Sequence, residues 1–281
     1  MPATYAHWTF GKKCIEVMPK NLQKIIHDNR EIYDLGVHGP DIFFYDLAHK
    51  EIADFGYSLH DIPAKEFFAN CKKQLNAHDE KAEMLAYIMG FLSHFVLDSS
   101  CHSYVEKKKE VSNVSHNQIE SQWERHLIEL DNRQPNLVDR AESLKPSKKI
   151  AKVISYFYKF DSNIVYRTIR NQKFVVTALN CISERKEKVL KKILKLLKMN
   201  NNADLFIGFK EDDRCSDSNI RLDKISNKAV KLYAKQMKNL LGFLNDNEKL
   251  NSYFDYDLAA RPDYKKIKVL SYNKELAYKI D

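Results

Sequence analysis

The stretch MLAYIMGFLSHFVLDSSCH, Met84 to His102, joins a continuous apolar run to His94, Asp98 and His102 at four-residue spacing. At about 100° per residue, positions i, i+4 and i+8 drift only ~80° around a helix, so the three side chains share one face. A run that is apolar on all sides is typical of a central, buried helix. Burying two imidazoles and a carboxylate there without a strong partner is costly. This pattern favours a metal ion over an ordinary ion pair four residues apart.

The rest of the chain also favours helices. Among 281 residues there are only seven glycines and seven prolines, and 30% of the residues are charged, which is an ordinary globular balance. We expect loops at 34–46 and 200–219, a tail of strand or short-helix pieces, and helices over 4–17, 19–26, from Pro63, 79–110, 115–130, 139–144, 147–160, 163–181, 184–199 and 222–244. These expectations describe an all-α helical bundle. Residues 1–200 would form the main helical domain, and 201–281 a helical extension packed on it or part of the same domain.

The sequence also bears on where the protein is located. We find no apolar run long enough to cross a bilayer, and the opening MPATYAHWTFGKKC lacks the basic and apolar regions of a signal peptide. The five cysteines are widely spaced and form no CxxC pair, which favours reduced thiols. Together these features predict a cytoplasmic protein. The formal net charge of +8 indicates either an anionic partner or simply a solvated basic surface.

A second pair of metal-binding residue types follows the long helix. HNQIE places His116 and Glu120 four residues apart, although such a pair is often only an ion pair. His7, Asp41 and His60 complete a set of eight nitrogen and carboxylate ligands within the first 120 residues, but none of these three stands out by itself. Imidazole and carboxylate are the ligands of a catalytic zinc that keeps an open position, whereas a structural zinc usually closes at four ligands.

The motifs HFVLD, CH and HNQIE, preceded by GPDI and an N-terminal histidine, resemble the bacterial zinc-dependent phospholipases C. The fold of that family is shared with the fungal single-strand-specific zinc nucleases, and the resemblance covers residues 1 to about 130. It implies up to three zinc ions in a cleft of an all-α bundle that hydrolyses phosphodiesters with a metal-activated water. The chain departs from the secreted members because it has no export signal, begins with Met, and keeps His102 in helical register with Asp98.

The resemblance also implies how the ligands are shared. One zinc would be held by Asp41, His60, His94 and Asp98, and a second by His102, His116 and Glu120. Asp98 would bridge to a third zinc, whose other ligands would be His7 and the amine of Pro2 exposed by removal of the initiator Met. The catalytic residues would be Asp98, which touches two metals, and Asp41, which either ligates zinc or orients the water. Among the remaining histidines, His38 is the best candidate for a supporting role.

Three kinds of function remain open at this point. The resemblance favours a phospholipid substrate, and the same zinc site would also serve a nuclease or nucleotidase. A helical protein that binds nucleic acid or acts as a scaffold, with zinc used only structurally, is the non-catalytic alternative. The segment 184–199 predicts an amphipathic helix with the stripe Leu190, Ile193, Leu194 and Leu197. It could contact an anionic membrane surface, but a bundle helix with its charged face in water is the more common arrangement.

Overall fold

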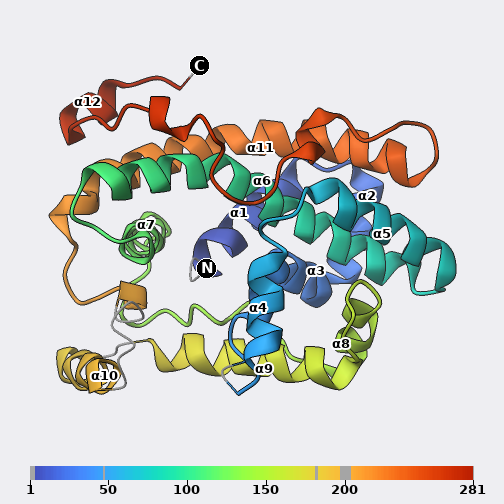
Figure 1. Ribbon diagram of the computed structural model, residues 1–281, viewed down its shortest axis with the longest axis horizontal. Helices are drawn as coiled ribbons and strands as arrows, with labels where there is room; N and C mark the ends of the chain where they lie inside the picture. The colour runs from blue at the N-terminus through green and yellow to red at the C-terminus, as the bar shows by residue number, and fades with distance from the viewer. Residues whose placement is uncertain (1–3, 47, 181–182, 197–203, 281) are drawn as a thin grey trace.

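The computed structural model describes residues 4–46, 48–180, 183–196 and 204–280, and it confirms the all-α class, with no strand in these ranges (Figure 1). The longer helices are α1 (Thr4–Glu16), α2 (Lys20–Asp28), α3 (Arg30–Gly36), α4 (Lys50–Ser58), α5 (Ala64–Ala77), α6 (Lys81–Val111), α7 (His116–Leu130), α8 (Lys148–Ser155), α9 (Ser162–Ala178), α10 (Glu184–Leu196), α11 (Ser216–Leu244) and α12 (Tyr272–Ala277). Short 3₁₀ turns are η1 (Gly39–Phe43), η3 (Asp213–Cys215), η4 (Ser252–Asp255) and η5 (Tyr264–Lys266).

The long helix α6 crosses the middle of the molecule and is the centre of its core. Helices α1, α3, α5, α7 and α11 all pack against it, so nearly every side chain from Met84 to Val105 is buried (Figure 1). By length and composition α6 could cross a membrane, but 89% of its most apolar 18-residue window is buried inside the protein. This burial is what the apolar run before His94 predicts for a core helix.

The contact between α3 and α6 is unusually close because two glycines face each other. A Cβ on Gly36 would lie 2.4 Å from the carbonyl oxygen of Tyr87, and a Cβ on Gly90 would lie 2.4 Å from that of Tyr33. The two backbones therefore approach each other at a distance that any side chain would prevent. This crossing delivers the chain after Gly36 directly to the His94 turn of α6.

Several local expectations differ from the structure. Residues 34–36, expected in a loop, complete the last turn of α3, and η1 follows at 39–43. The segment 139–144 forms turns instead of a helix, and α8 ends at Ser155 instead of Phe160. Helix α4 was not predicted because its short amphipathic run lies next to the Gly/Pro-rich stretch. In each case tertiary packing outweighs a weak local signal.

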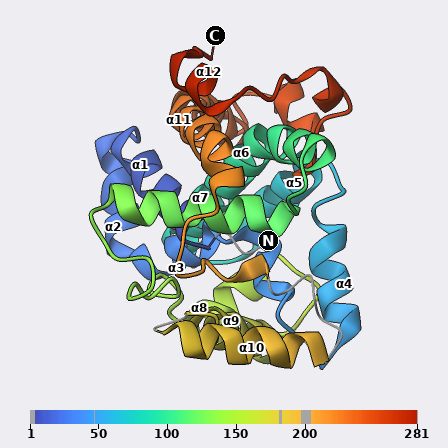
Figure 2. The same cartoon turned by 90° about the vertical axis from the view of Figure 1, so that its left-hand side faces the viewer.

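Helix α11 and the C-terminal segment lie beside α6 on the side opposite α8, α9 and α10 (Figures 1 and 2). Helix α11 packs against α1, α6 and α7. The backbone N–H of Leu258 donates to the carbonyl of His60, and the N–H of Ala64 donates to that of Tyr256. The C-terminal segment thus reaches the start of α5, and the Arg261 N–H donates to Ser103 Oγ on α6. The division of the chain into two parts at residue 200 stays a prediction.

The described cysteines are Cys14, Cys71, Cys101 and Cys215, and all four are buried, free thiols. Cys181 lies outside the described residues. The free thiols agree with the expectation drawn from cysteine spacing, whereas a cytoplasmic location stays a prediction.

Candidate metal centre

Helix α6 places His94, Asp98 and His102 on one face, buried against α1, η1 and α7. The Asp98 carboxylate lies between the two imidazoles of its own helix, with Oδ2 3.2 Å from His94 Nε2 and Oδ1 3.6 Å from His102 Nε2. The four-residue spacing therefore places the three side chains next to one another, as helical geometry predicts.

The α3–α6 crossing brings Asp41 into the same cluster. The chain leaves α3 and turns at Gly39, whose φ of +51° is unfavourable for residues with a side chain. A Cβ at Gly39 would lie 2.5 Å from His94 Cδ2, so the turn also needs glycine for space. Asp41, in η1, then places Oδ1 3.9 Å from His94 Nε2.

His60 enters from the turn after α4. Its Nε2 atom lies 3.1 Å from Asp41 Oδ1. The local geometry depends on Leu258, whose backbone N–H donates to the His60 carbonyl. A residue that was not distinctive in the sequence is thus held beside Asp41 by a segment almost 200 positions away.

Helix α7 supplies His116 and Glu120. Ser115 caps this helix as predicted, since its hydroxyl accepts a hydrogen bond from the Gln118 N–H at 3.1 Å. Glu120 Oε1 then lies 3.0 Å from His116 Nε2 and 3.7 Å from His102 Nε2. This carboxylate joins the α7 pair to α6.

His7, on α1, contacts two of the α6 residues in the cluster. Its ring stacks on His94 with centroids 4.3 Å apart, and its Nε2 atom lies 3.2 Å from Asp98 Oδ1. Asp98 therefore contacts three imidazoles, from His7, His94 and His102. Pro2, the other expected ligand near this position, lies outside the described residues.

Three groups of ligand atoms emerge from this arrangement, and within each group the atoms lie within 4.8 Å of one another. The groups are His102, His116 and Glu120; His60, His94 and Asp98; and His7, Asp41 and His94. All eight predicted side chains of the described part are therefore brought together. Their assignment to individual zinc ions stays a prediction.

The histidine rings are oriented by acceptors on their outer nitrogens. The Nδ1–H groups of His60, His94 and His102 donate to the backbone carbonyls of Gly56, Val37 and Leu258 respectively. Each bond leaves Nε2 directed toward the carboxylates, which is how proteins set the tautomer of a metal-binding histidine.

His116 uses a side chain for the same purpose. Its Nδ1 atom lies 2.7 Å from Glu106 Oε1, and Glu106 comes from the last turns of α6. Carboxylate–histidine pairs of this kind commonly support a metal ligand. The sequence reasoning missed Glu106, which has no helical spacing to His116 that would single it out.

The electrostatics of the cluster favour bound cations. Burial by itself would raise the pKa of Glu120, but His116 and His102 outweigh it and lower that pKa to about 2. Burial would lower the pKa of His116, but Glu120 and Glu106 raise it to about 10. For Asp98, three imidazoles likewise outweigh burial and hold its pKa well below the usual range. The carboxylates are thus kept ionised inside the protein, where an ionised group needs a positive partner.

Buried polar atoms that lack a hydrogen-bond partner test whether the cluster suits a metal ion. The buried atoms without a hydrogen-bond partner in the described structure include His7 Nδ1, His94 Nε2, Asp98 Oδ2, His102 Nε2 and Glu120 Oε2. Native proteins rarely leave buried polar atoms unpaired without a reason such as an ion. These are nitrogen and carboxylate oxygen donors, which suit zinc.

A model of the family described as zinc-dependent phospholipase C matches residues 6–206 of the chain. The chain belongs to the zinc-dependent phospholipase C family. The match includes all eight clustered side chains and ends before α11, so it extends beyond the resemblance noted at residues 1–130. Comparisons with curated proteins and with solved structures find no significant match.

Two further buried side chains support the cluster. Glu124 was not singled out in the sequence, and His38 was named there only as a candidate. Glu124, one turn beyond Glu120, is fully buried; it accepts the N–H of Tyr5 at 2.5 Å and pairs with Arg140 Nη1 at 3.1 Å. It therefore ties the first turn of α1, and with it His7, to α7. His38 was the favoured supporting histidine, and its Nε2 atom lies 2.8 Å from Ser143 Oγ behind the Gly39 turn.

Proposed function

We propose that this zinc-dependent phospholipase C family member is a phosphodiester hydrolase that acts on a phospholipid and binds up to three zinc ions. The observation that carries the proposal is the cluster of eight side chains, five of which have a buried nitrogen or oxygen atom without a hydrogen-bond partner in the described structure. A purely structural zinc closes at four ligands, and a cluster of this size exceeds that need.

The residues would be shared among the ions as the resemblance to the family implies. His102, His116 and Glu120 would hold one zinc, Asp41, His60, His94 and Asp98 a second, and His7 with Asp98 a third. Bound zinc supplies Lewis acidity, which lowers the pKa of water and neutralises charge on phosphate oxygens.

The protein's own groups orient the reaction. Asp98 would hold neighbouring sites in register because both of its oxygens face imidazoles. Asp41, paired with His60 at 3.1 Å, would either ligate or accept a hydrogen bond from the attacking water. A cysteine nucleophile is not needed: Cys101 is buried, and burial raises its pKa well above the usual thiol range.

The side of approach follows from exposure. The His94 side chain is fully buried, whereas those of His60 and His116 are 11% and 20% exposed. We infer that substrate reaches the cluster past His60 and His116, with His94 forming its floor.

The test is hydrolysis by purified, zinc-loaded protein of a phosphatidylcholine analogue, single-stranded DNA and a nucleotide monophosphate. We expect release of a phosphorylated headgroup from the first substrate. Faster cleavage of DNA or of the monophosphate would favour the nuclease or nucleotidase alternative. No turnover of any of the three, with zinc bound, would favour the non-catalytic alternative.

The amino-terminal ligand can be tested separately. If Pro2 supplies an amine to the zinc held by His7, an uncleavable tag before it should lower the zinc content by one ion per chain. A tag after Asp281 should leave the zinc content unchanged. Full zinc content in the N-terminally tagged protein would exclude this ligand.

Contact with a membrane surface is supported by α10. Of the predicted stripe, Ile193 is 45% exposed, Leu190 and Leu194 are partly buried, and Leu197 lies outside the described residues. Val189 and Leu196 are exposed beside Ile193, at 51% and 75%. They recur at helical spacing on a helix with six Lys or Arg residues and two Glu. An exposed apolar stripe beside cationic groups suits an anionic lipid surface.

Co-sedimentation with phosphatidylserine and phosphatidylcholine vesicles tests this contact. Ile193→Glu should reduce binding to phosphatidylserine vesicles, whereas Leu137→Glu, at a comparably exposed site on another part of the surface, should not. Equal losses in the two variants would argue against a membrane role for α10.

A further inference from the structure

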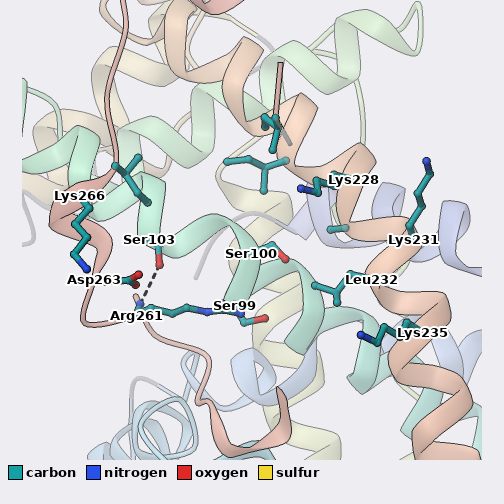
Figure 3. Close-up of a pocket in the computed structure, with 14 residues that line it drawn as sticks. Ser99, Ser100, Ser103, Lys228, Lys231, Leu232, Lys235, Arg261, Asp263 and Lys266 are labelled. Carbon is teal, nitrogen blue, oxygen red and sulfur yellow. Dashed lines mark hydrogen bonds between the residues drawn. The ribbon is translucent and has the colours of Figure 1, made fainter. Parts of the chain in front are cut away.

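A separate groove lies between α6, α11 and the C-terminal segment (Figure 3). Its volume is about 690 Å³, within the roughly 300–1,000 Å³ range of small-molecule sites. On α6 it is lined by Ser99, Ser100 and Ser103. Ser100 is turned about 200° around the helix from Asp98, so the groove opens away from the metal cluster.

The rim of the groove is strongly cationic. Lys228, Lys231 and Lys235 project from α11, and Arg261 and Lys266 come from the opposite, C-terminal side (Figure 3). A single carboxylate, Asp263, also lines it. In the described part of the chain none of the four lysines has a carboxylate within ion-pair distance. A concentration of unpaired positive charge around a concave site attracts anions.

The side chain of Arg261 packs against the protein itself. Its guanidinium lies over the ring of Tyr256, 4.2 Å from the centroid, and its backbone N–H donates to Ser103 Oγ at 3.0 Å. Its Nε atom is buried and has no hydrogen-bond partner in the described structure. The side chain is therefore held in place with a donor left over, as an anion-binding arginine requires.

The floor of the groove is apolar. Ile225, Ala229 and Leu232 line it from α11, and Ile267 and Ile280 from the C-terminal segment. A second hollow of about 460 Å³ continues from it past Tyr104, sharing Ile225, Ile267 and Ile280. Arg221, Lys266 and Lys268 also line this second hollow, so it combines apolar and cationic side chains. A purely ionic ligand would have no use for the apolar ones.

We propose that this groove binds an anionic amphiphile, with a phosphate or carboxylate head among Lys228, Lys231, Lys235 and Arg261 and an acyl chain along Ile225, Leu232 and Ile267. The head would take charge-assisted hydrogen bonds, and the chain would gain from removal of apolar surface from water. The site is distinct from the metal cluster and does not depend on the reaction proposed there.

The experiment is calorimetric titration of the full-length, zinc-loaded protein with dodecyl phosphate below its micelle concentration. Inorganic phosphate provides the head without the chain, and dodecyltrimethylammonium provides the chain with the opposite charge. We expect dodecyl phosphate to bind at least roughly tenfold more tightly than either.

Variants locate the binding. Lys231→Glu with Lys235→Glu should weaken dodecyl phosphate at least roughly tenfold, since two attractive charges become repulsive. Lys238→Glu, an exposed lysine of the same helix outside the groove, is the matched control and should bind normally. Leu232→Asn should reduce the affinity for dodecyl phosphate toward that for inorganic phosphate. Thermal melting and hydrolytic activity should stay unchanged in the lysine variants.

Three results would overturn the proposal. The first is dodecyl phosphate binding no tighter than inorganic phosphate, which would indicate a simple phosphate site or the metal cluster. The second is equal loss in Lys238→Glu and the double variant, which would indicate non-specific attraction. The third is tighter binding of a short single-stranded oligonucleotide with the same dependence on Lys231 and Lys235, which would make the groove a nucleic-acid site.

Discussion

Replacement of Gly39 by alanine tests how the fold holds the candidate metal centre. An alanine Cβ would lie 2.5 Å from His94 Cδ2 and 2.9 Å from His94 Nε2. The ring has little freedom to yield, because it stacks on His7 and its Nδ1–H donates to the Val37 carbonyl at 3.2 Å. Either the η1 turn or the His94 ring must move.

Two costs add at this position. The φ of +51° places a residue with a side chain in the left-handed region, at about 1–2 kcal/mol. Crowding in a packed interior adds about 1–3 kcal/mol. We therefore expect Gly39→Ala to lower the free energy of unfolding by about 2–5 kcal/mol. Displacement of His94 or Asp41 should also lower zinc affinity.

Gly208 offers a matched control. Its φ is +74°, but the nearest atom to an added Cβ, the Lys210 carbonyl oxygen, is 3.5 Å away. Gly208→Ala should therefore cost only the backbone part, about 1–2 kcal/mol, and leave the zinc content unchanged.

Urea unfolding with and without zinc, combined with elemental analysis, measures both effects. Equal destabilisation of the two alanine variants would refute the steric argument. Normal zinc content in Gly39→Ala would show that the close approach does not position His94.

Other perturbations have equally specific outcomes. Asp98→Asn should keep the fold, measured by circular dichroism. Its loss of activity should exceed the roughly 10–100-fold loss that follows removal of an outer partner of a metal site. Near-full turnover under zinc saturation would exclude a bridging role for Asp98. His94→Ala and His116→Ala should each lower the zinc count, whereas His78→Ala should not, because His78 stacks on Tyr156 outside the cluster; an equal zinc count in all three would contradict the ligand set. Burial lowers the pKa of His38 to about 3, below its unfolded value near 6.5, so its contribution to stability is present above pH 6.5 and is lost as pH falls toward 3. His38→Gln should therefore reduce the difference in the free energy of unfolding between pH 7 and pH 4, measured by urea unfolding. An unchanged difference would refute this contribution of His38.

The family, the helical class and the two helix-borne ligand sets were predictable from the sequence. Spacing of four places His94, Asp98 and His102 on one face of any helix, and the same holds for His116 and Glu120. The long apolar run required a buried helix, and Ser115 marked the start of the next one. These features depend on neighbours within one or two turns, so they do not depend on how the helices pack.

Asp41, His60 and His7 converge on α6 only through tertiary structure. The Gly36–Gly90 contact sets how closely α3 approaches α6, and the Leu258 backbone both accepts from His102 and donates to His60. Such contacts join residues far apart in sequence, and no local periodicity encodes the distance between them. The cationic groove has the same origin: lysines that are only a solvated helix face in the sequence surround an apolar hollow once α11 packs beside α6 and the C-terminal segment crosses them.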